Sequence, residues 1–349
     1  MAKIVLVTSF FNFSGPNNVL RNLIKGFNLS NEDFVVCSLR RGGDKKYINS
    51  LETTENNCLE PEGNSFIHLL KIILSNKPLV VHSSGIRADI FTYILSFFFS
   101  FKAITTVHNI PNEDYLYRYG KVMSFLMLLA HGLVFRSERV RKVCVSKNVE
   151  NNLISKLGGR NCTVIYNGVD EELYRAGDVG SQSDRKRIVF CGHLSPLKNP
   201  LELADVAGEF PNCDFIYLGS GPLYDELNTY SDNVYTYGRV DNVSDELSIS
   251  NVFVMPSKTE GMPMAFIEAL FSNIPVVCSN IPIFEEIGKI PTKSNIYIFE
   301  LGSRESLINS IRSALELRKS CNREFALERF SYKIMSEGYL IEYKTVNGN

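Results

Sequence analysis

Two glutamates eight positions apart, Glu260 and Glu268, stand in the part of the chain that most favours chemistry. Glu260 follows a short apolar run at 252–255, which is typical of a buried strand. Pro263 comes three positions later, and proline suits the start of a helix because the amide it lacks would have no partner there. The sequence therefore predicts that Glu260 lies in a loop between a strand and a helix.

The predicted helix, 263–271, is apolar on nearly every side except at Glu268. A helix of this kind is buried, so a carboxylate within it carries a large desolvation cost unless something binds it. The amides at the start of the helix and the helix dipole favour a phosphate. Since Glu260 is a negative charge beside that phosphate site, we expect it to face a sugar. The segment predicts a binding site for a hydroxyl-rich or cationic group next to a phosphate.

Two more loops at strand ends could approach a phosphate. Lys198 closes a loop that follows the predicted strand 187–192 and precedes a helix, and a cation there is well placed to meet a phosphate. A solvated surface lysine explains Lys198 equally well. The glycines of Gly219-Ser-Gly221 let a backbone approach a ligand closely, but they suit a tight turn equally.

The first half of the chain has two comparable positions. Ser14-Gly15-Pro16 opens a helix after the first predicted strand, in a similar geometry. His108 stands at the carboxyl end of another predicted strand, where a histidine can reach a ligand. A histidine that only makes structural hydrogen bonds is the alternative there.

Composition limits the class of protein. The chain has 349 residues, 44% of them hydrophobic, with a formal charge of -1, so it is predicted to be a soluble globular protein of two domains. The lack of a basic excess argues against a nucleic-acid partner. Eight cysteines without a Cys-x-x-Cys pair fit free thiols in a reducing cytoplasm, and no metal-ligand cluster is visible. The N-terminus does not resemble a signal peptide, and the most hydrophobic stretch, 90–104, falls short of a bilayer span.

Strand-like runs alternate with helix-length segments twice over, which predicts two doubly wound α/β domains with parallel sheets. The expected strands are 3–9, 34–39, 79–82, 103–108, 142–146 and 163–167 in the first half, and 187–192, 215–219, 234–238, 252–255, 275–279 and 296–299 in the second. No Gly-x-Gly-x-x-Gly dinucleotide fingerprint is present. We expect an N-terminal domain at 1–172, a polar hinge at 173–187, a C-terminal domain at 188–323 and a C-terminal amphipathic helix at 324–349, with its apolar positions within 324–343.

Segments spread over both halves of the chain resemble retaining glycosyltransferases of family 4, which have the GT-B fold. These segments are EGMPMAFIEAL (260–270), GHLSPLK (192–198), YLGSG (217–221), YTYGRV (235–240), VIYNGVD (164–170) and VSKNV (145–149). The resemblance implies two facing Rossmann-like domains and a C-terminal helix that crosses back to the first domain. It also implies that the C-terminal domain binds most of a nucleotide-sugar, without a metal or a cofactor.

The resemblance also implies roles for individual residues. Glu268 would bind the ribose hydroxyls, which answers its desolvation cost, and Glu260 would hold donor-sugar hydroxyls near the reacting carbon. Lys198 would neutralise the diphosphate leaving group, and His108 matches a histidine near the donor sugar and the acceptor. The catalytic residues implied are thus His108, Lys198 and Glu260. Further donor-binding positions are Gly15, His193, Arg239, Val240, Gly261, Met262, Pro263 and Met264.

Two positions depart from the family pattern. His193 stands where arginine is common, five positions before the lysine, and a neutral histidine would stabilise a diphosphate less, although a nearby phosphate would raise its pKa. Ser14 replaces the first glycine of a usual pair. Both glutamates and the lysine remain, so we still expect an active enzyme.

The resemblance implies a retaining, metal-independent hexosyltransferase. A hexose-type sugar would pass from a nucleotide diphosphate donor, of which a UDP-sugar is our first expectation, to a hydroxyl of a glycan or lipid-linked glycan in bacterial surface-polysaccharide synthesis. Two alternatives stay open: a non-catalytic partner of another transferase, and a sugar-nucleotide epimerase or hydrolase on the same fold. We expect a cytoplasmic location, with peripheral contact to the inner membrane as an option.

The segment 115–129 bears on that option because it combines aromatic residues, cations and an apolar face. Such a segment could rest on an anionic membrane that carries a lipid-linked glycan. A core helix with a tyrosine-rich rim is the alternative, and it is the interpretation we favour from the sequence.

Overall fold

The computed structural model describes residues 3–54, 57–176, 185–291, 293–317 and 319–345. The chain divides into two compact units: unit 1, Met1–Gly168 with Tyr332–Asn349, and unit 2, Val169–Ser331. The chain thus enters unit 2 at Val169 and returns to unit 1 at Tyr332. Of the predicted hinge, residues 177–184 lie outside the described residues.

Unit 1 is built on a seven-stranded parallel sheet with the order β3-β2-β1-β4-β5-β6-β7. Its strands are β1 (Ile4–Thr8), β2 (Phe34–Ser38), β3 (Cys58–Leu59), β4 (Val80–Ser84), β5 (Lys102–Val107), β6 (Val140–Cys144) and β7 (Cys162–Val164). Its helices are α1 (Gly15–Leu29), α2 (Lys45–Asn49), α3 (Ser65–Asn76), α4 (Ile86–Leu95), α5 (Pro111–Arg136), α6 (Lys147–Leu157) and α14 (Tyr332–Thr345).

Unit 2 is built on a six-stranded parallel sheet with the order β10-β9-β8-β11-β12-β13. Its strands are β8 (Lys186–Cys191), β9 (Cys213–Leu218), β10 (Val234–Gly238), β11 (Val252–Met255), β12 (Val276–Ser279) and β13 (Ile296–Phe299). Its α-helices are α7 (Pro200–Ala204), α8 (Tyr224–Asn228), α9 (Val243–Ser248), α10 (Met264–Phe271), α11 (Pro282–Gly288), α12 (Arg304–Leu315) and α13 (Asn322–Leu327).

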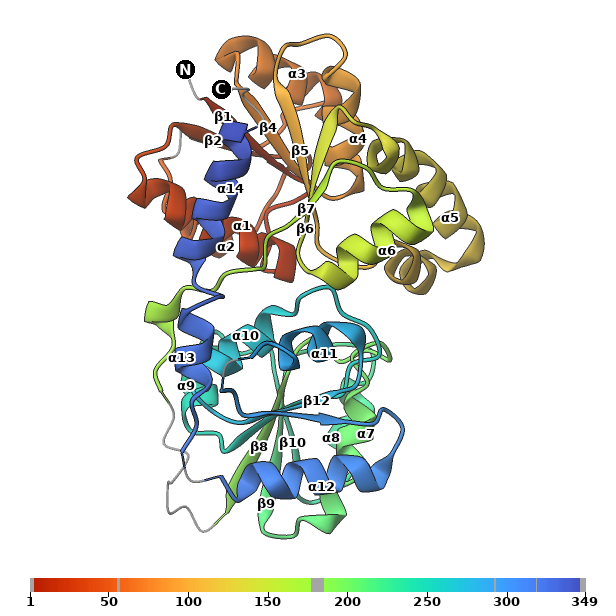
Figure 1. The fold of residues 1–349 in the computed structure, drawn as a ribbon, viewed down its shortest axis with the longest axis vertical. Helices are drawn as coiled ribbons and strands as arrows, with labels where there is room; N and C mark the ends of the chain where they lie inside the picture. The colour runs from red at the N-terminus through yellow and green to blue at the C-terminus, as the bar shows by residue number, and fades with distance from the viewer. Residues whose placement is uncertain (1–2, 55–56, 177–184, 292, 318, 346–349) are drawn as a thin grey trace. The chain divides into compact units, whose positions relative to one another are not determined.

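The strands explain the layering of each unit. Every residue of β1, β2, β11 and β12 is buried, which requires cover on both faces of the sheet. Helices supply that cover, and Figure 1 shows them on both sides of each sheet. The predicted α/β fold with two doubly wound domains is confirmed, and the two-residue strand β3 is the one described strand that the sequence did not predict.

Strand order places the candidate sites. In unit 1 the order reverses between β1 and β4, and in unit 2 it reverses between β8 and β11. In open parallel sheets, ligands bind beyond the carboxyl ends of the strands at such a reversal, because the flanking connections leave in opposite directions and open a crevice. The loops after β1 and β4, and after β8 and β11, are therefore where ligand-binding residues are expected.

The C-terminal segment forms two helices, so the prediction of a single helix over 324–343 is wrong. α13 ends at Leu327 and α14 begins at Tyr332. Between them Ser331 forms a parallel bridge with Val169, and its Oγ donates to a carboxylate oxygen of Glu171 at 2.8 Å. These contacts hold the backbone extended at Ser331, which ends the helical hydrogen-bonding pattern there.

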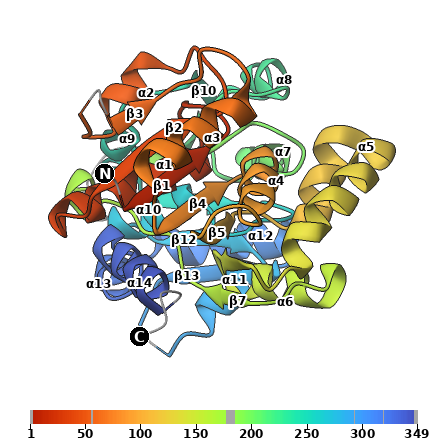
Figure 2. The ribbon, with the colours of Figure 1, turned by 90° about the horizontal axis from the view of Figure 1, so that it is seen from above.

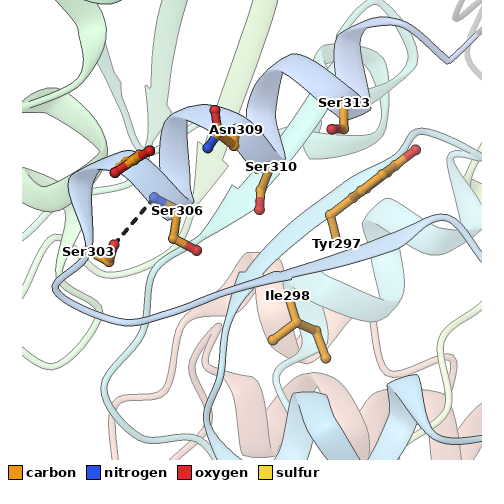
Figure 3. Close-up of a pocket in the computed structure, with 8 residues that line it drawn as sticks. Tyr297, Ile298, Ser303, Ser306, Asn309, Ser310 and Ser313 are labelled. Atoms are coloured by element: carbon orange, nitrogen blue, oxygen red, sulfur yellow. Dashed lines mark hydrogen bonds between the residues drawn. The ribbon is translucent and has the colours of Figure 1, made fainter.

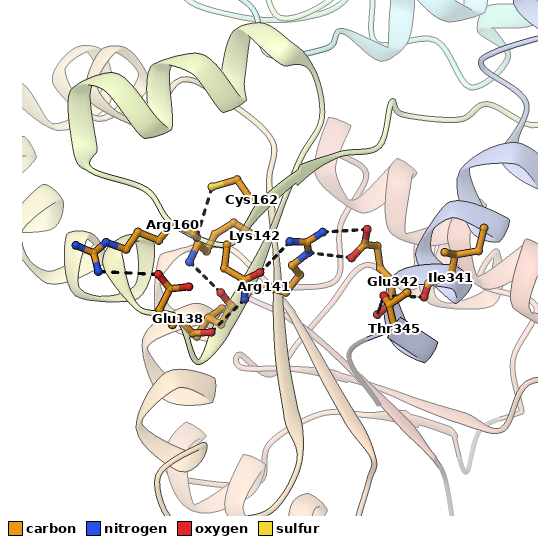
Figure 4. Close-up of polar contacts among 10 residues, drawn as sticks. Glu138, Arg141, Lys142, Arg160, Cys162, Ile341, Glu342 and Thr345 are labelled. Carbon is orange, nitrogen blue, oxygen red and sulfur yellow. Dashed lines mark hydrogen bonds and ion pairs between the residues drawn. The ribbon is translucent and has the colours of Figure 1, made fainter. Parts of the chain in front are cut away.

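α14 is fastened to unit 1 by buried polar contacts as well as by packing on α1. His82 Nδ1 lies 2.6 Å from Tyr343 Oη, and His82 Nε2 lies 2.7 Å from Thr106 Oγ1. Nearer the surface, the Arg141 guanidinium meets both carboxylate oxygens of Glu342 at 2.8 and 3.2 Å (Figure 4). The C-terminal helix is thus an integral part of unit 1.

Two histidines of unit 1, buried His82 and half-buried His108, predict acid sensitivity. Burial, with a smaller effect of neighbouring His108, lowers the pKa of His82 from 6.5 to about 3. Burial also lowers the pKa of His108 to about 4. Below pH 6.5 these histidines bind protons in the unfolded chain but stay neutral in the folded chain. We therefore expect the free energy of unfolding to fall as the pH drops from about 6.5 towards 4. Thermal unfolding at pH 7.5 and pH 5 measures this loss.

The variant His82→Gln is the control for this pH effect. It removes one of the two groups whose pKa is lowered, so its unfolding midpoint should change less between pH 7.5 and pH 5 than that of the wild type. Equal pH dependence in the two proteins would show that His82 does not cause the loss.

The segment 115–129 lies within α5 and is largely exposed, so the core-helix interpretation is wrong. Val122, Phe125 and Leu126 are 77%, 61% and 52% exposed. Figures 1 and 2 show α5 at the outside of unit 1, where no described helix covers its outer side. The sequence predicted the helix correctly. It did not predict that the apolar face would be exposed, because such faces are usually buried.

Candidate functional site

An ion pair joins the loops on either side of the strand-order reversal of unit 2. Lys198 Nζ, in the loop after β8, lies 2.5 Å from Glu260 Oε1, in the loop after β11. Ser257 Oγ donates to the same carboxylate oxygen at 2.8 Å. The Glu260 residue is only 8% exposed, so these two contacts supply a buried charge with the partners it needs.

Neighbouring backbone contacts fix the loop of Glu260. The amide of Lys258 donates to the carbonyl of Leu197 at 2.8 Å and so ties this loop to the loop of Lys198. Ser279 Oγ, at the end of β12, donates to the carbonyl of Ser257 at 2.6 Å. Three strand ends therefore hold the ion pair in place, which is the support that a preorganised site requires.

The helix α10 presents its N-terminus beside Glu260. Pro263 is the N-cap residue of α10, and no side chain caps the helix. Gly261, Met262, Pro263 and Met264 are all buried, so the turn that leads into the helix is firmly packed. An uncapped N-terminus of eight-residue α10 leaves backbone amides directed at this edge of the sheet, and such amides favour an anion.

Glu268 is half-buried. The sequence predicted that its carboxylate would be buried and carry a large desolvation cost, and this prediction overestimated its burial. Within α10 only Ala265 and Glu268 are not fully buried. They are three positions apart, and both face the open side of the helix. Glu268 lies near Cys191, the last residue of β8. Burial raises the pKa of the Cys191 thiol most, the charge of Glu268 raises it further, and Lys198 lowers it. Lys198 and Glu268 thus act on the same strand end.

The glycines of the 219–221 loop serve the packing of two loops. A Cβ at Gly219 would lie 1.9 Å from the carbonyl oxygen of Gly192, and a Cβ at Gly221 would lie 2.4 Å from that of Leu194. The amide of Leu194 also donates to the carbonyl of Ser220 at 2.9 Å. The structure shows a use of these glycines that differs from both predicted alternatives, ligand approach and a tight turn, because they permit close backbone approach between two loops of the protein.

The remaining predicted positions of unit 2 follow the same edge of the sheet. His193 is exposed just after β8, while exposed Arg239 and half-buried Val240 follow β10. Because β10, β9, β8 and β11 are neighbours and parallel, the loops after them lie in one row. The structure brings Lys198 and Glu260 into contact, and it places the other residues along that row.

The candidate residues of unit 1 lie at its own strand-order reversal. His108 Nε2, after β5, is 3.0 Å from Ser84 Oγ at the end of β4. Gly15 is the first residue of α1 after β1, and the space around its Cα is open. The lowered pKa of His108, about 4, results from burial, so its ring is neutral at pH 7. It can accept or donate one hydrogen bond there but carries no charge.

Two serines of these sites escaped sequence reasoning. Ser257 binds Glu260, and Ser84 binds His108. Ser84 is the last residue of β4, and Ser257 follows the end of β11 by two positions. A place at the carboxyl end of a strand is the same signal that singled out His108. The sequence predicted that β4 ends at His82, but it ends two residues later at Ser84. Because of that error, Ser84 was not recognised as a residue at a strand end.

Unit 2 also holds a shallow pocket that contains none of these residues. It has a volume of about 470 Å³ and lies between β13 and α12. Figure 3 shows the hydroxyl groups of Ser306 and Ser310 directed towards the strand, and Ser303 caps α12 by accepting from the amide of Ser306 at 3.3 Å. The Lys198–Glu260 ion pair lies in the loops after β8 and β11, and neither residue lines this pocket.

Two further observations concern the described residues alone. Within them, no group of three or more His, Cys, Asp or Glu side chains could hold a metal ion. No helix in the described part of the chain is both long and apolar enough to cross a membrane.

Comparison with known proteins identifies the class. Residues 13–173 match the model of Glycosyltransferase Family 4, and residues 176–324 match the model of Glycosyl transferases group 1. The chain is therefore a glycosyltransferase, and its two parallel-sheet units are those of the GT-B fold.

Individual relatives span almost the whole chain. An O-antigen biosynthesis glycosyltransferase of Escherichia coli is 26% identical over 97% of this chain and 96% of the relative. A UDP-Gal:alpha-D-GlcNAc-diphosphoundecaprenol alpha-1,3-galactosyltransferase of Escherichia coli is 27% identical over 71% of this chain and 69% of the relative. The structure of HepE of Anabaena in complex with UDP and glucose has a TM-score of 0.83 at 16% identity, and it covers 99% of this chain and 100% of HepE.

Proposed function

We propose that this glycosyltransferase moves a hexose from a UDP-sugar to a hydroxyl of a glycan or lipid-linked glycan, with retention at the anomeric carbon. The observation that carries the proposal is the Lys198–Glu260 pair beside the uncapped N-terminus of α10, at the strand-order reversal of unit 2. The cation and the helix amides suit a diphosphate, and the carboxylate suits sugar hydroxyls. Relatives that bind UDP or use UDP-galactose favour a UDP-sugar donor.

The ion pair is proposed to open when the donor binds. Lys198 has a 28% exposed side chain and can turn its ammonium group towards an arriving diphosphate, whereas Glu260, with a 7% exposed side chain, stays in place. The carboxylate would then exchange its Lys198 contact for donor-sugar hydroxyls while Ser257 continues to hold it. Glu268, on the open side of α10, is proposed to bind the ribose.

The transfer step needs charge stabilisation on the leaving diphosphate. As the bond between the anomeric carbon and the diphosphate breaks, Lys198 and the α10 amides would stabilise the developing charge. The acceptor hydroxyl would attack on the face that the diphosphate leaves, and the diphosphate would take its proton. We propose that this occurs without a metal, so that activity survives treatment with EDTA.

In unit 1 we propose a role on the acceptor side of the reaction. His108, neutral and bound to Ser84, would contribute a hydrogen bond near the donor sugar and the acceptor, and Gly15 would let the loop after β1 approach the diphosphate. A relative that acts in O-antigen biosynthesis favours surface-polysaccharide assembly in a bacterium as the setting, and we propose that the protein acts in the cytoplasm.

A donor screen tests the proposed function. The protein is incubated with isotopically labelled UDP-sugars, with and without glycan acceptors, and the products are separated and analysed by NMR. We expect a glycoside that forms only with an acceptor, whose anomeric coupling constant matches that of the donor. Conversion of the donor without an acceptor would indicate an epimerase or hydrolase. Binding without turnover would indicate a non-catalytic partner, and inverted product would contradict the proposed retention.

A further inference from the structure

The helix α5 folds back on itself at Gly120. In an uninterrupted helix, residues 16 positions apart would be separated by about 24 Å. Tyr115 Oη nevertheless lies 2.6 Å from His131 Nδ1, and their rings stack at 6.1 Å. Gly120, with φ of 72° and ψ of 176°, interrupts the helix between them. The two stretches of α5 therefore lie side by side as a hairpin.

A buried polar chain holds the inner side of this hairpin against unit 1. His131 Nε2 lies 2.9 Å from a carboxylate oxygen of Asp89, a residue of α4 that is only 2% exposed. The other oxygen of Asp89 accepts from Ser83 Oγ and Thr105 Oγ1, both at 2.6 Å. Buried contacts on the inner side of the hairpin therefore fix its position against unit 1.

The outer side of the second stretch is apolar along its whole length. Residues 122, 126, 129 and 133 follow the spacing of one helix face, and they are Val, Leu, Leu and Leu. They are 77%, 52%, 52% and 61% exposed, in that order. A helix face that contacts only water is normally polar, because exposing apolar area to water is unfavourable. A continuous stripe of this kind marks a binding surface.

The charged side chains of residues 115–137 have one sign. Residues 115–137 contain no Asp or Glu, although the whole chain has a formal charge of -1. At the hairpin tip stand Arg118, whose side chain is 58% exposed, and exposed Lys121. Asp114, which pairs with Arg118, is only 18% exposed, so the cation faces outwards. Exposed Tyr117 and Tyr119 flank these cations, and tyrosine favours a membrane–water interface.

We propose that the outer face of α5 rests on an anionic phospholipid bilayer. Apolar side chains would enter the acyl boundary, while Lys121 and Arg118 meet lipid phosphates. A second copy of the chain fits this face less well, because a two-fold contact would bring Arg118 and Lys121 of both copies together, and residues 115–137 contain no Asp or Glu to face them. The inference goes beyond the proposed transfer reaction and does not depend on it.

Vesicle flotation of the full chain tests this surface. The wild type should float with vesicles of phosphatidylglycerol and phosphatidylcholine, and much less with phosphatidylcholine alone. The double variant Leu126→Ser/Leu129→Ser should lower the partition coefficient about 100-fold, since two leucines no longer enter the bilayer. Lys121→Gln should lower it about fivefold, and only with phosphatidylglycerol present.

A matched control is available within unit 1. Leu29 and Ile154, on α1 and α6, are 60% and 48% exposed, so Leu29→Ser/Ile154→Ser removes similar exposed apolar area elsewhere. This control should float like the wild type, and circular dichroism should give all variants the same unfolding midpoint. No flotation of the wild type, or equal loss in the control, would overturn the proposal. So would a dimer that does not float and that dissociates in the Leu126/Leu129 variant, since it would assign the face to a second copy.

Discussion

Replacing Lys198 by methionine is expected to lower the rate of sugar transfer by about 100- to 1000-fold, which is the usual effect of removing one preorganised charge-stabilising donor. Methionine keeps much of the side-chain volume but cannot stabilise the leaving diphosphate. The effect should appear in kcat and also weaken UDP binding, because the diphosphate is present in both the ground state and the transition state. Steady-state kinetics with the donor found in the screen measure both quantities.

The controls for this prediction use the ion-pair partner. Lys198→Met leaves Glu260 buried without its cation, which costs stability by itself. The double variant Lys198→Met/Glu260→Gln removes both charges, so it should recover the unfolding midpoint but not the activity. Glu260→Gln alone should lower kcat while UDP affinity stays near that of the wild type, since Glu260 is assigned to the sugar. Recovered activity in the double variant would mean that Lys198 acts only by neutralising Glu260.

Replacing Asp89 by alanine is expected to be the most destabilising single change in unit 1. It leaves His131 and the hydroxyls of Ser83 and Thr105 without their buried acceptor. The loss of one member of a buried charged network costs about 3 to 5 kcal/mol. For a unit of this size that is a fall of about 6 to 20 °C in the unfolding midpoint, measured by thermal unfolding.

Two variants check the origin of this loss. Asp89→Asn keeps the shape and can still accept from Ser83 and Thr105, so it should lose less stability than alanine. Asp33→Ala removes an exposed carboxylate of the same unit and should change the midpoint very little. If Asp89→Ala were no worse than Asp33→Ala, the network would not anchor α5.

The fold followed from the sequence because its signal is local and repeated. Apolar runs such as 252–255 have the length of buried strands, and their alternation with helical segments leaves few topologies other than two doubly wound units. The C-terminal break was missed, because the bridge between Ser331 and Val169 joins residues far apart in the chain. Helical periodicity continues across that break and gives no sign of it.

The site could be predicted in its residue types but not in its contacts. Strand ends pointed to Lys198, Glu260 and His108, since parallel strands bring their carboxyl ends to one edge. Which carboxylate is buried was decided by the packing of loops, so Glu260 proved more buried than Glu268. The same limit applies to α5, whose apolar pattern predicted a helix but could not distinguish a covered face from an open one.

The central claim is that the edge of unit 2 at Lys198 binds the diphosphate of a nucleotide-sugar. Isothermal titration of UDP into the wild type and into Lys198→Met/Glu260→Gln tests it most directly, because the double variant leaves no buried charge unpaired. We predict that the dissociation constant rises about tenfold or more, as expected for the loss of one charge-assisted contact to a phosphate. Equal affinity of the two proteins for UDP, or no binding by the wild type, would contradict the claim.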